Sequence, residues 1–225
     1  MKHPAQRPRP IEWRLMGVAI LGLSLGLSPF VQVQAADAAS FEAAFSEFQR
    51  ANSGIDAAID AAAERFAVLS AAAPGDPVLL AYSGAATAMR ARAAYMPWNK
   101  LSLAEDGLAQ IDKALALLTP AHDGALYHGT PASLETRFTA ASTYLALPSM
   151  FNRHARGAKL LDDVLANPLL ASAPLPFRGA VWLRAASEAN ADKRPDDARR
   201  LLQQVLSSGA PQAEKAQAKL KDLAS

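Results

Sequence analysis

Prolines and glycines divide this chain into segments in which apolar residues recur every three or four positions. That interval is typical of α-helices that bury one face. The motif Pro74-Gly75-Asp76-Pro77 can end one helix and begin the next, because Asp76 can accept free N–H groups and Pro77 fits a first helical turn. Alanine, the strongest helix former, supplies nearly a quarter of the chain, and isoleucine and valine are scarce. We therefore predict an all-α fold with thin cores.

The same distribution of prolines and glycines predicts nine helices and no strand. Ser40 is the expected N-cap of the first helix, Thr130-Pro131 is the expected start of the fifth, and residues 119–129 are expected to form a loop. Two apolar stripes predict buried helix faces, namely Ile55, Ile59, Ala62, Phe66 and Leu69 in the second helix, and Leu101, Ala104, Leu108, Ile111, Leu115 and Leu118 in the fourth. The last helix, 211–223, is expected to cap the array with its Lys- and Gln-rich face or to pair with another subunit.

Regular helix pairs invite comparison with repeat proteins. A tetratricopeptide unit holds two helices in about 34 residues, and its second helix carries a small residue, a large one four later, an apolar one three later, and a proline after that. Ala62, Phe66, Leu69 and Pro74 have this spacing, and residues 182–211 nearly repeat it. The middle pairs are longer, with insertions at 96–100 and 119–129.

On these motifs, residues 41–211 resemble tetratricopeptide repeats. The resemblance implies an antiparallel helix-pair solenoid, a tetratricopeptide-like superhelix, for residues 36–225; the alternative is a generic helical bundle. A narrower resemblance, to exported bacterial tetratricopeptide-like proteins with no settled activity, implies no catalytic residues. It rests on Tyr82-Ser83-Gly84-Ala85, Pro97-Trp98-Asn99-Lys100-Leu101, Gly107-Leu108 and Ile111-Asp112-Lys113-Ala114.

Residues 1–35 have the layout of a secretory signal peptide. A basic segment, 1–14, precedes an uncharged apolar run, 15–27, and Val33-Gln34-Ala35 supplies small residues before a cleavage position. The apolar run is shorter than the roughly 20 residues that span a bilayer. We therefore predict a periplasmic protein with no membrane span after cleavage; the alternative is an uncleaved N-terminal anchor at 15–33.

The charge of the chain argues against nucleic acid as a partner. Residues 1–35 hold four of the 23 basic residues and one of the 21 acidic ones, so the remainder carries a net charge of −1. A nearly neutral protein has no long-range field that attracts polyanions. The chain has no cysteine, which excludes disulfides and thiolate chemistry.

No motif of known catalytic chemistry is present, so we expect no enzyme activity, no metal and no cofactor. His122, Asp123 and His128 share one glycine-containing loop, which offers little of the fixed geometry that a metal needs. The acidic pairs Glu105-Asp106 and Asp162-Asp163 are neighbours on helices, and neighbours point about 100° apart. We expect them to be solvated helix surface.

Two polar and aromatic clusters are candidate partner-binding surfaces, because Arg, Tyr and Trp often anchor interfaces. The first comprises Arg90, Arg92, Tyr95, Trp98, Asn99 and Lys100, and the second comprises Arg153, His154 and Arg156. Structural alternatives remain open. Trp98 could pack under the turn with the arginines paired to Glu105 or Asp106, and the second cluster could be a solvated helix start. We also predict an ion pair between Asp112 and Arg137.

Export, repeat architecture and missing catalytic motifs together predict a periplasmic scaffold that binds another envelope protein or a peptide segment. The alternative is a protein that binds a small molecule, or an unrecognised enzyme, with its site in a groove near residues 95–100.

Overall fold

The computed structural model describes the backbone of residues 29–223 and the side chains of residues 38–223. This part of the chain contains nine α-helices, four short 3-10 helices and one small β-hairpin. The α-helices are α1 (Pro29–Asn52), α2 (Ile59–Ala72), α3 (Pro77–Ala93), α4 (Pro97–Ala116), α5 (Ala132–Ala146), α6 (His154–Ala166), α7 (Leu175–Ala191), α8 (Pro195–Ser207) and α9 (Ala213–Asp222). The other elements are η1 (Asp56–Ala58), η2 (Pro120–Asp123), η3 (Ser149–Phe151), η4 (Pro168–Ser172), β1 (Leu126–Tyr127) and β2 (Thr130–Pro131).

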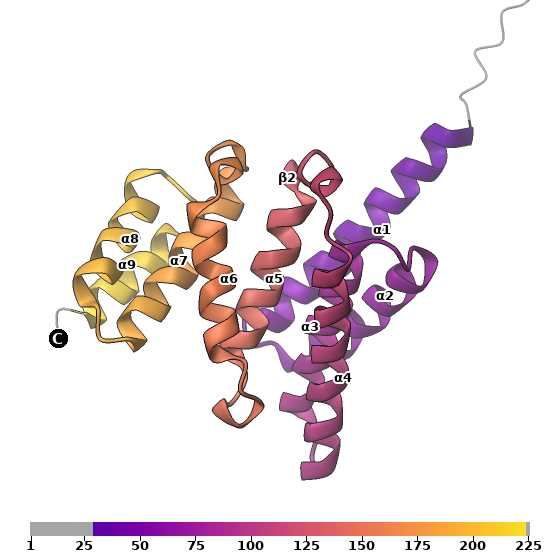
Figure 1. The fold of residues 1–225 in the computed structure, drawn as a ribbon, viewed down its shortest axis with the longest axis horizontal. Coiled ribbons are helices and arrows are strands. Elements are labelled where there is room, and N and C mark those ends of the chain that lie inside the picture. The colour runs from indigo at the N-terminus through magenta and orange to yellow at the C-terminus, as the bar shows by residue number, and fades with distance from the viewer. Residues whose placement is uncertain (1–28, 224–225) are drawn as a thin grey trace, which may run out of the picture.

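Successive helices pack against each other as hairpins. The pairs α1–α2, α3–α4, α5–α6 and α7–α8 follow one another across the molecule, and α9 packs on α8 (Figure 1). The predicted all-α class is confirmed, and nine helices lie within residues 29–223. The prediction of no strand was wrong, because β1 and β2 pair as an antiparallel hairpin. His128 and Gly129 between them both have positive φ, as a tight two-residue hairpin turn requires.

The first helix is longer than the sequence predicts. Ser40 is not its N-cap, because α1 begins at Pro29 and runs without a break through residues 33–35. Residues 1–28, which hold most of the predicted signal peptide, lie outside the described residues. Export and cleavage therefore stay predictions. Between residues 29 and 223, no helix is both long enough and apolar enough to cross a membrane.

Helix α3 lies at the centre of the N-terminal half. The predicted cap is confirmed: the Asp76 carboxylate accepts hydrogen bonds from the backbone N–H groups of Val78 (2.9 Å) and Leu79 (3.1 Å). Most of the helix is buried, because it packs against α2, α4 and α5. Because the Asp76 cap defines where α3 begins, it also positions the residues of α3 that contact these three helices.

The α3–α4 hairpin is the most closely packed pair. Gly84 and Gly107 face each other where the helices cross, and a Cβ on Gly107 would lie 2.5 Å from the Gly84 carbonyl oxygen. A Cβ on Gly84 would lie 2.6 Å from the Gly107 carbonyl oxygen. Only glycine permits this approach, so the two backbones meet directly.

The core differs between the two halves of the array. Aromatic rings fill the N-terminal part, namely Phe41, Phe45, Phe48, Phe66, Tyr82 and Tyr127. Aliphatic side chains and alanines from α5 to α9 make up most of the C-terminal part, together with Trp182, Phe138 and Phe177. Both predicted stripes are buried along most of their length, but Ile55 and Leu101 are exposed since each lies at a hairpin end beyond its neighbouring helix.

Candidate functional site

The turn between α3 and α4 carries the most exposed aromatic side chains of the described residues. Helix α3 ends at Ala93, residues 94–96 are extended or turn backbone, and α4 restarts at Pro97. Tyr95 is 88% exposed and Trp98 is 67% exposed. Met96 and Leu101 add further exposed apolar surface. We call Tyr95, Met96, Trp98 and Leu101 the apolar tip; Trp98 does not pack under the turn.

The two arginines of the first predicted cluster hold this hairpin to the α1–α2 turn. Arg90 Nε lies 2.7 Å from Asp60, and Arg92 Nη2 lies 2.9 Å from Asp56. Arg92 also donates to the carbonyl oxygen of Ala51 at 3.0 Å. The alternative prediction, that these arginines pair with Glu105 or Asp106, was wrong, because both arginines lie on the side of α3 that faces α2. Asn99 and Lys100 are exposed on the first turn of α4.

A further exposed apolar side chain lies in the turn of the next hairpin. Met150, in the turn between α5 and α6, is 70% exposed. Figure 1 shows this turn and the α3–α4 turn along the same lower edge of the array. Met150 was not among the predicted site residues, because a methionine in a turn belongs to no periodic pattern that distinguishes an exposed side chain from a buried one.

The two arginines of the second predicted cluster make contacts within the protein. Arg153 Nη2 lies 2.9 Å from Asp112, Arg156 also pairs with Asp112, and the Tyr144 hydroxyl donates to the same carboxylate at 2.5 Å. Both guanidinium groups lie over the Tyr144 ring. Burial and the Asp112 contact raise the pKa of the Tyr144 phenol, so it remains a neutral donor.

The predicted Asp112–Arg137 pair was wrong. Asp112 contacts Arg153 and Arg156 of the α5–α6 hairpin instead. Arg137 donates a hydrogen bond to the Ser133 carbonyl oxygen, one turn earlier on α5. Sequence alone could place Asp112 beside the buried stripe but could not decide which of several arginines the hairpin would bring to it.

Replacing Asp112 with alanine is expected to lower the free energy of unfolding by about 1–2 kcal/mol, because two guanidinium groups and a phenol lose their common acceptor at a partly exposed site. A thermal melt followed by circular dichroism measures the change. Arg137→Lys is the matched control and should melt within about 0.5 kcal/mol of the wild type. Equal losses in both variants would contradict the assignment of Asp112 to Arg153 and Arg156.

The histidine loop has structural partners. His122 and Thr119 form a capping box for η2, Ser133 donates to Asp123, and His128 Nε2 lies 2.7 Å from Glu42. Among the described residues, no group of three or more His, Asp or Glu side chains is arranged to hold a metal ion.

A buried acid lies under α1, and the sequence analysis missed it. Glu135, in the first turn of α5, accepts a hydrogen bond from the Tyr82 hydroxyl inside the aromatic core. Burial raises the pKa of Glu135 to about 7, although the Tyr82 hydrogen bond lowers it in part. Glu135 is the only acidic residue of α5, and that was the signal available. Glu135 is 8% exposed and its bonding partner is a core tyrosine, which fits a structural role.

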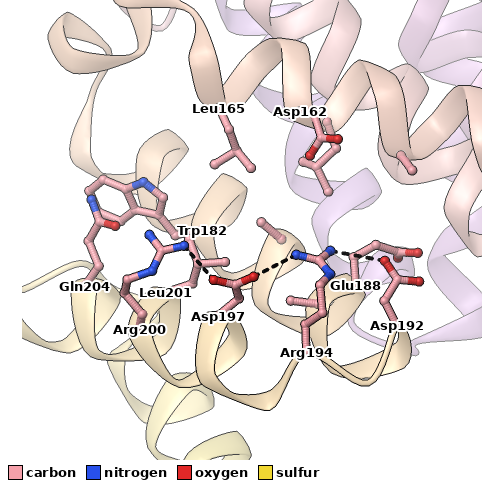
Figure 2. A pocket seen from close by; sticks show the side chains of 14 residues that line it. Asp162, Leu165, Trp182, Glu188, Asp192, Arg194, Asp197, Arg200, Leu201 and Gln204 are labelled. Atoms are coloured by element: carbon pink, nitrogen blue, oxygen red, sulfur yellow. Dashed lines mark hydrogen bonds and ion pairs between the residues drawn. The ribbon is translucent and has the colours of Figure 1, made fainter.

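A groove crosses the C-terminal half, far along the chain from residues 95–100, which form a projecting turn instead. Its volume is about 390 Å³. Helix α7 forms its floor and α6 and α8 its walls, each contributing residues three or four apart (Figure 2). The lining residues are Ala158, Leu161, Asp162, Leu165, Trp182, Ala185, Glu188, Ala189, Asp192, Arg194, Asp197, Arg200, Leu201 and Gln204.

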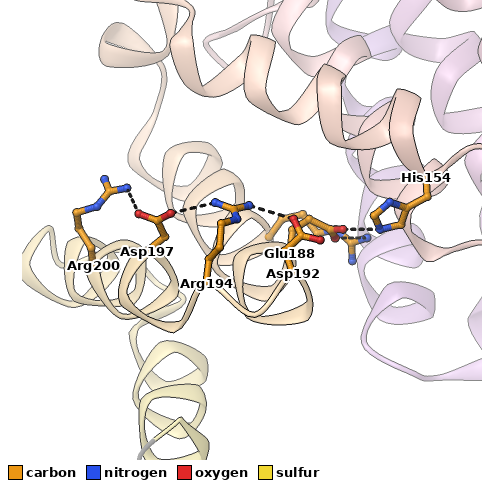
Figure 3. A network of polar contacts seen from close by, with 7 residues as sticks. His154, Glu188, Asp192, Arg194, Asp197 and Arg200 are labelled. Carbon is orange, nitrogen blue, oxygen red and sulfur yellow. Dashed lines mark hydrogen bonds and ion pairs between the residues drawn. The ribbon is translucent and has the colours of Figure 1, made fainter.

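A row of ion pairs edges this groove (Figure 3). Arg194 lies 3.1 Å from Asp192 and 3.0 Å from Asp197, and Arg200 lies 3.0 Å from Asp197. Hydrogen bonds from Arg200 and Arg194 lower the pKa of Asp197, which therefore stays ionised. His154, the third residue of the second predicted cluster, reaches the end of this row, with Nε2 2.6 Å from Glu188 Oε1.

No protein-family model, curated protein or solved structure matches this chain. Its function is therefore inferred from its own residues and their geometry.

Proposed function

We propose that this protein is a periplasmic tetratricopeptide-like scaffold that binds another envelope protein through the apolar tip, with no catalytic activity of its own. The observation that carries the proposal is the exposure of Tyr95 and Trp98 on a projecting hairpin. Exposing large aromatic side chains to water is unfavourable. A partner that covers them removes their apolar surface from water, which stabilises the complex.

The rigidity of the hairpin supports a binding role. The Gly84–Gly107 crossing joins α3 to α4, and the Arg90–Asp60 and Arg92–Asp56 pairs join α3 to the preceding hairpin. Aromatic side chains on a fixed support lose little conformational entropy when they bind, which favours affinity. Met150, in the turn of the next hairpin, adds a further exposed apolar side chain.

The repeat-like architecture is supported by packing at the motif positions. Ala62 and Phe66 of α2 are both fully buried, and Phe66 stacks on the Tyr82 ring of α3 at 4.9 Å. A small residue and a large one four later thus fill the contact between one hairpin and the next, as in repeat proteins whose units contact only their neighbours. The periplasmic location rests on the sequence of residues 1–35.

The test is crosslinking capture from envelope extracts with a C-terminally tagged chain. We expect the wild type to retain one specific protein and Tyr95→Ala/Trp98→Ala to retain at least about 10-fold less, as loss of two interface aromatics implies. Val68→Ala/Leu126→Ala removes two exposed apolar side chains from other surfaces, and it should bind as the wild type does. Capture of no specific protein by the wild type would refute the proposal, as would equal losses in the two double variants.

A further inference from the structure

Within residues 38–223, three hydrogen bonds of one kind join the α3–α4 hairpin to the segment that follows it. In each bond a tyrosine hydroxyl donates to a carboxylate on the other side of the joint. The three pairs are Tyr82 with Glu135, Tyr127 with Asp76, and Tyr144 with Asp112. The first two lie beside the start of α5, and the third lies beside its end. We call these two places the Glu135 end and the Asp112 end of the joint.

The Asp112 end holds its charges across the neutral pH range. One carboxylate there faces two guanidinium groups, with Arg153 Nη2 at 2.9 Å and Arg156 in contact. Aspartate and arginine side chains both stay ionised near neutral pH. The raised pKa of the Tyr144 phenol keeps it a neutral donor to the same carboxylate. A rise in pH through neutrality therefore leaves the contacts at this end intact.

The Glu135 end has no comparable balance of charge. The Glu135 carboxylate is buried, it accepts a hydrogen bond from Tyr82, and no lysine, arginine or histidine of residues 38–223 forms an ion pair with it. Arg137, two residues further along α5, donates to the Ser133 carbonyl oxygen instead. Burial raises the pKa of Glu135 to about 7, so the closed joint holds the neutral acid at lower pH. At higher pH the closed joint encloses a charge without a counter-ion, which is costly.

Four other charged or titratable side chains of the described residues border the Glu135 end. Three are carboxylates, namely Glu42 of α1, Asp76 at the start of α3 and Asp123 of η2, and each is held there by a partner on the β-hairpin or α5. The fourth is His128, whose Nε2 lies 2.7 Å from Glu42. A histidine loses its charge as the pH rises through neutrality. The Glu135 end therefore becomes more negative over the same range in which Glu135 ionises.

We propose that this joint is a pH-sensitive hinge that opens at the Glu135 end above neutral pH, while the Asp112 end stays closed and acts as the pivot. Opening admits water to the carboxylate, and hydration removes the cost of the buried charge. A difference of one pKa unit corresponds to a factor of ten. A pKa of about 7 in the closed form and 4.5 in water therefore raises the ratio of open to closed molecules by about 70-fold between pH 5 and pH 8. The hinge does not depend on the function proposed for the apolar tip.

Double electron–electron resonance between paired spin labels tests the hinge in the full chain. The chain has no cysteine, so two introduced cysteines carry the only labels. Val68→Cys and Ala166→Cys place one label on α2 and one on the last residue of α6, beside the start of α5. Ala109→Cys and Met150→Cys place one label on α4, three residues before Asp112, and one just beyond the end of α5. All four side chains are exposed, so the labels should leave the packing unchanged.

We expect the distance between the labels at Val68 and Ala166 to lengthen by about 5 Å or more between pH 5 and pH 8, and the distance between those at Ala109 and Met150 to stay within about 2 Å. Glu135→Gln should abolish the lengthening, because the amide does not ionise. A first distance that does not change overturns the proposal, as does lengthening that persists in Glu135→Gln. Equal lengthening of both distances would show a general loosening, and it overturns the hinge as well.

Discussion

Replacing Glu135 with glutamine is expected to stabilise the protein at pH 8 by about 3 kcal/mol while leaving its stability at pH 4 nearly unchanged. Burial raises the pKa of Glu135 from 4.5 to about 7 in the folded protein. A raised carboxyl pKa means that the folded state holds a proton which the unfolded state releases between these pH values. The favourable contribution of protonated Glu135 to the free energy of unfolding is therefore complete below pH 4.5, and it is lost as the pH rises through 7.

Urea unfolding at several pH values from 4 to 8 measures this effect. The wild type should lose stability over that range, and Glu135→Gln should lose about 3 kcal/mol less, because the amide is neutral and can still accept from Tyr82. Glu105→Gln, on the exposed face of α4, is the control and should follow the wild type. An unchanged pH dependence in Glu135→Gln would show that Glu135 does not titrate in this range.

Replacing Gly107 with alanine is expected to lower the free energy of unfolding by about 2–3 kcal/mol. In an ordinary helix interior this substitution is stabilising by about 1 kcal/mol, so the expected sign is reversed. The reason is the crossing with α3: the new Cβ would lie 2.5 Å from the Gly84 oxygen and 2.7 Å from the Ala88 nitrogen. Both are backbone atoms, so one helix must move as a body.

Thermal and urea melts measure this loss. Gly75→Ala is the control, because a Cβ there meets nothing within 4 Å, and its change should stay within about 0.5 kcal/mol. If α4 moves to admit the new side chain, the Tyr95–Leu101 turn moves with it, so crosslinking capture of the partner should weaken as well. Stabilisation by Gly107→Ala would contradict the close crossing.

Much of the helical architecture could be predicted from the sequence, since it depends on local interactions. The Asp76 cap and the stripe around Ile111 both depend on residues within a few positions of each other. The β-hairpin could not be predicted, because its turn needs His128 at positive φ, a conformation that non-glycine residues adopt rarely. The upstream extension of α1 contradicted a plausible cap at Ser40.

The sites were predicted less well, because they depend on contacts between distant segments. The sequence left open whether Trp98 is exposed or packs under the turn, and the partners of Arg90, Arg153 and His154 lie 30 or more residues away. The groove needs three helices to be placed before any of its residues become neighbours. Glu135 becomes recognisable as a buried acid only when α5 is placed against Tyr82 of α3.

The enclosure of Glu135 has a consequence for the order in which the chain assembles. A polypeptide leaves a ribosome or a membrane channel from its N-terminus, so Phe41, Phe45 and Phe48 of α1 emerge first. The aromatic cluster they join also requires Tyr82 and is closed by α5 at Glu135. Part of the apolar face of α1 packs on Phe66 of α2, but the part that contacts Tyr127 stays uncovered until more than half of the chain has emerged. Any chaperone that attends this protein should hold that face.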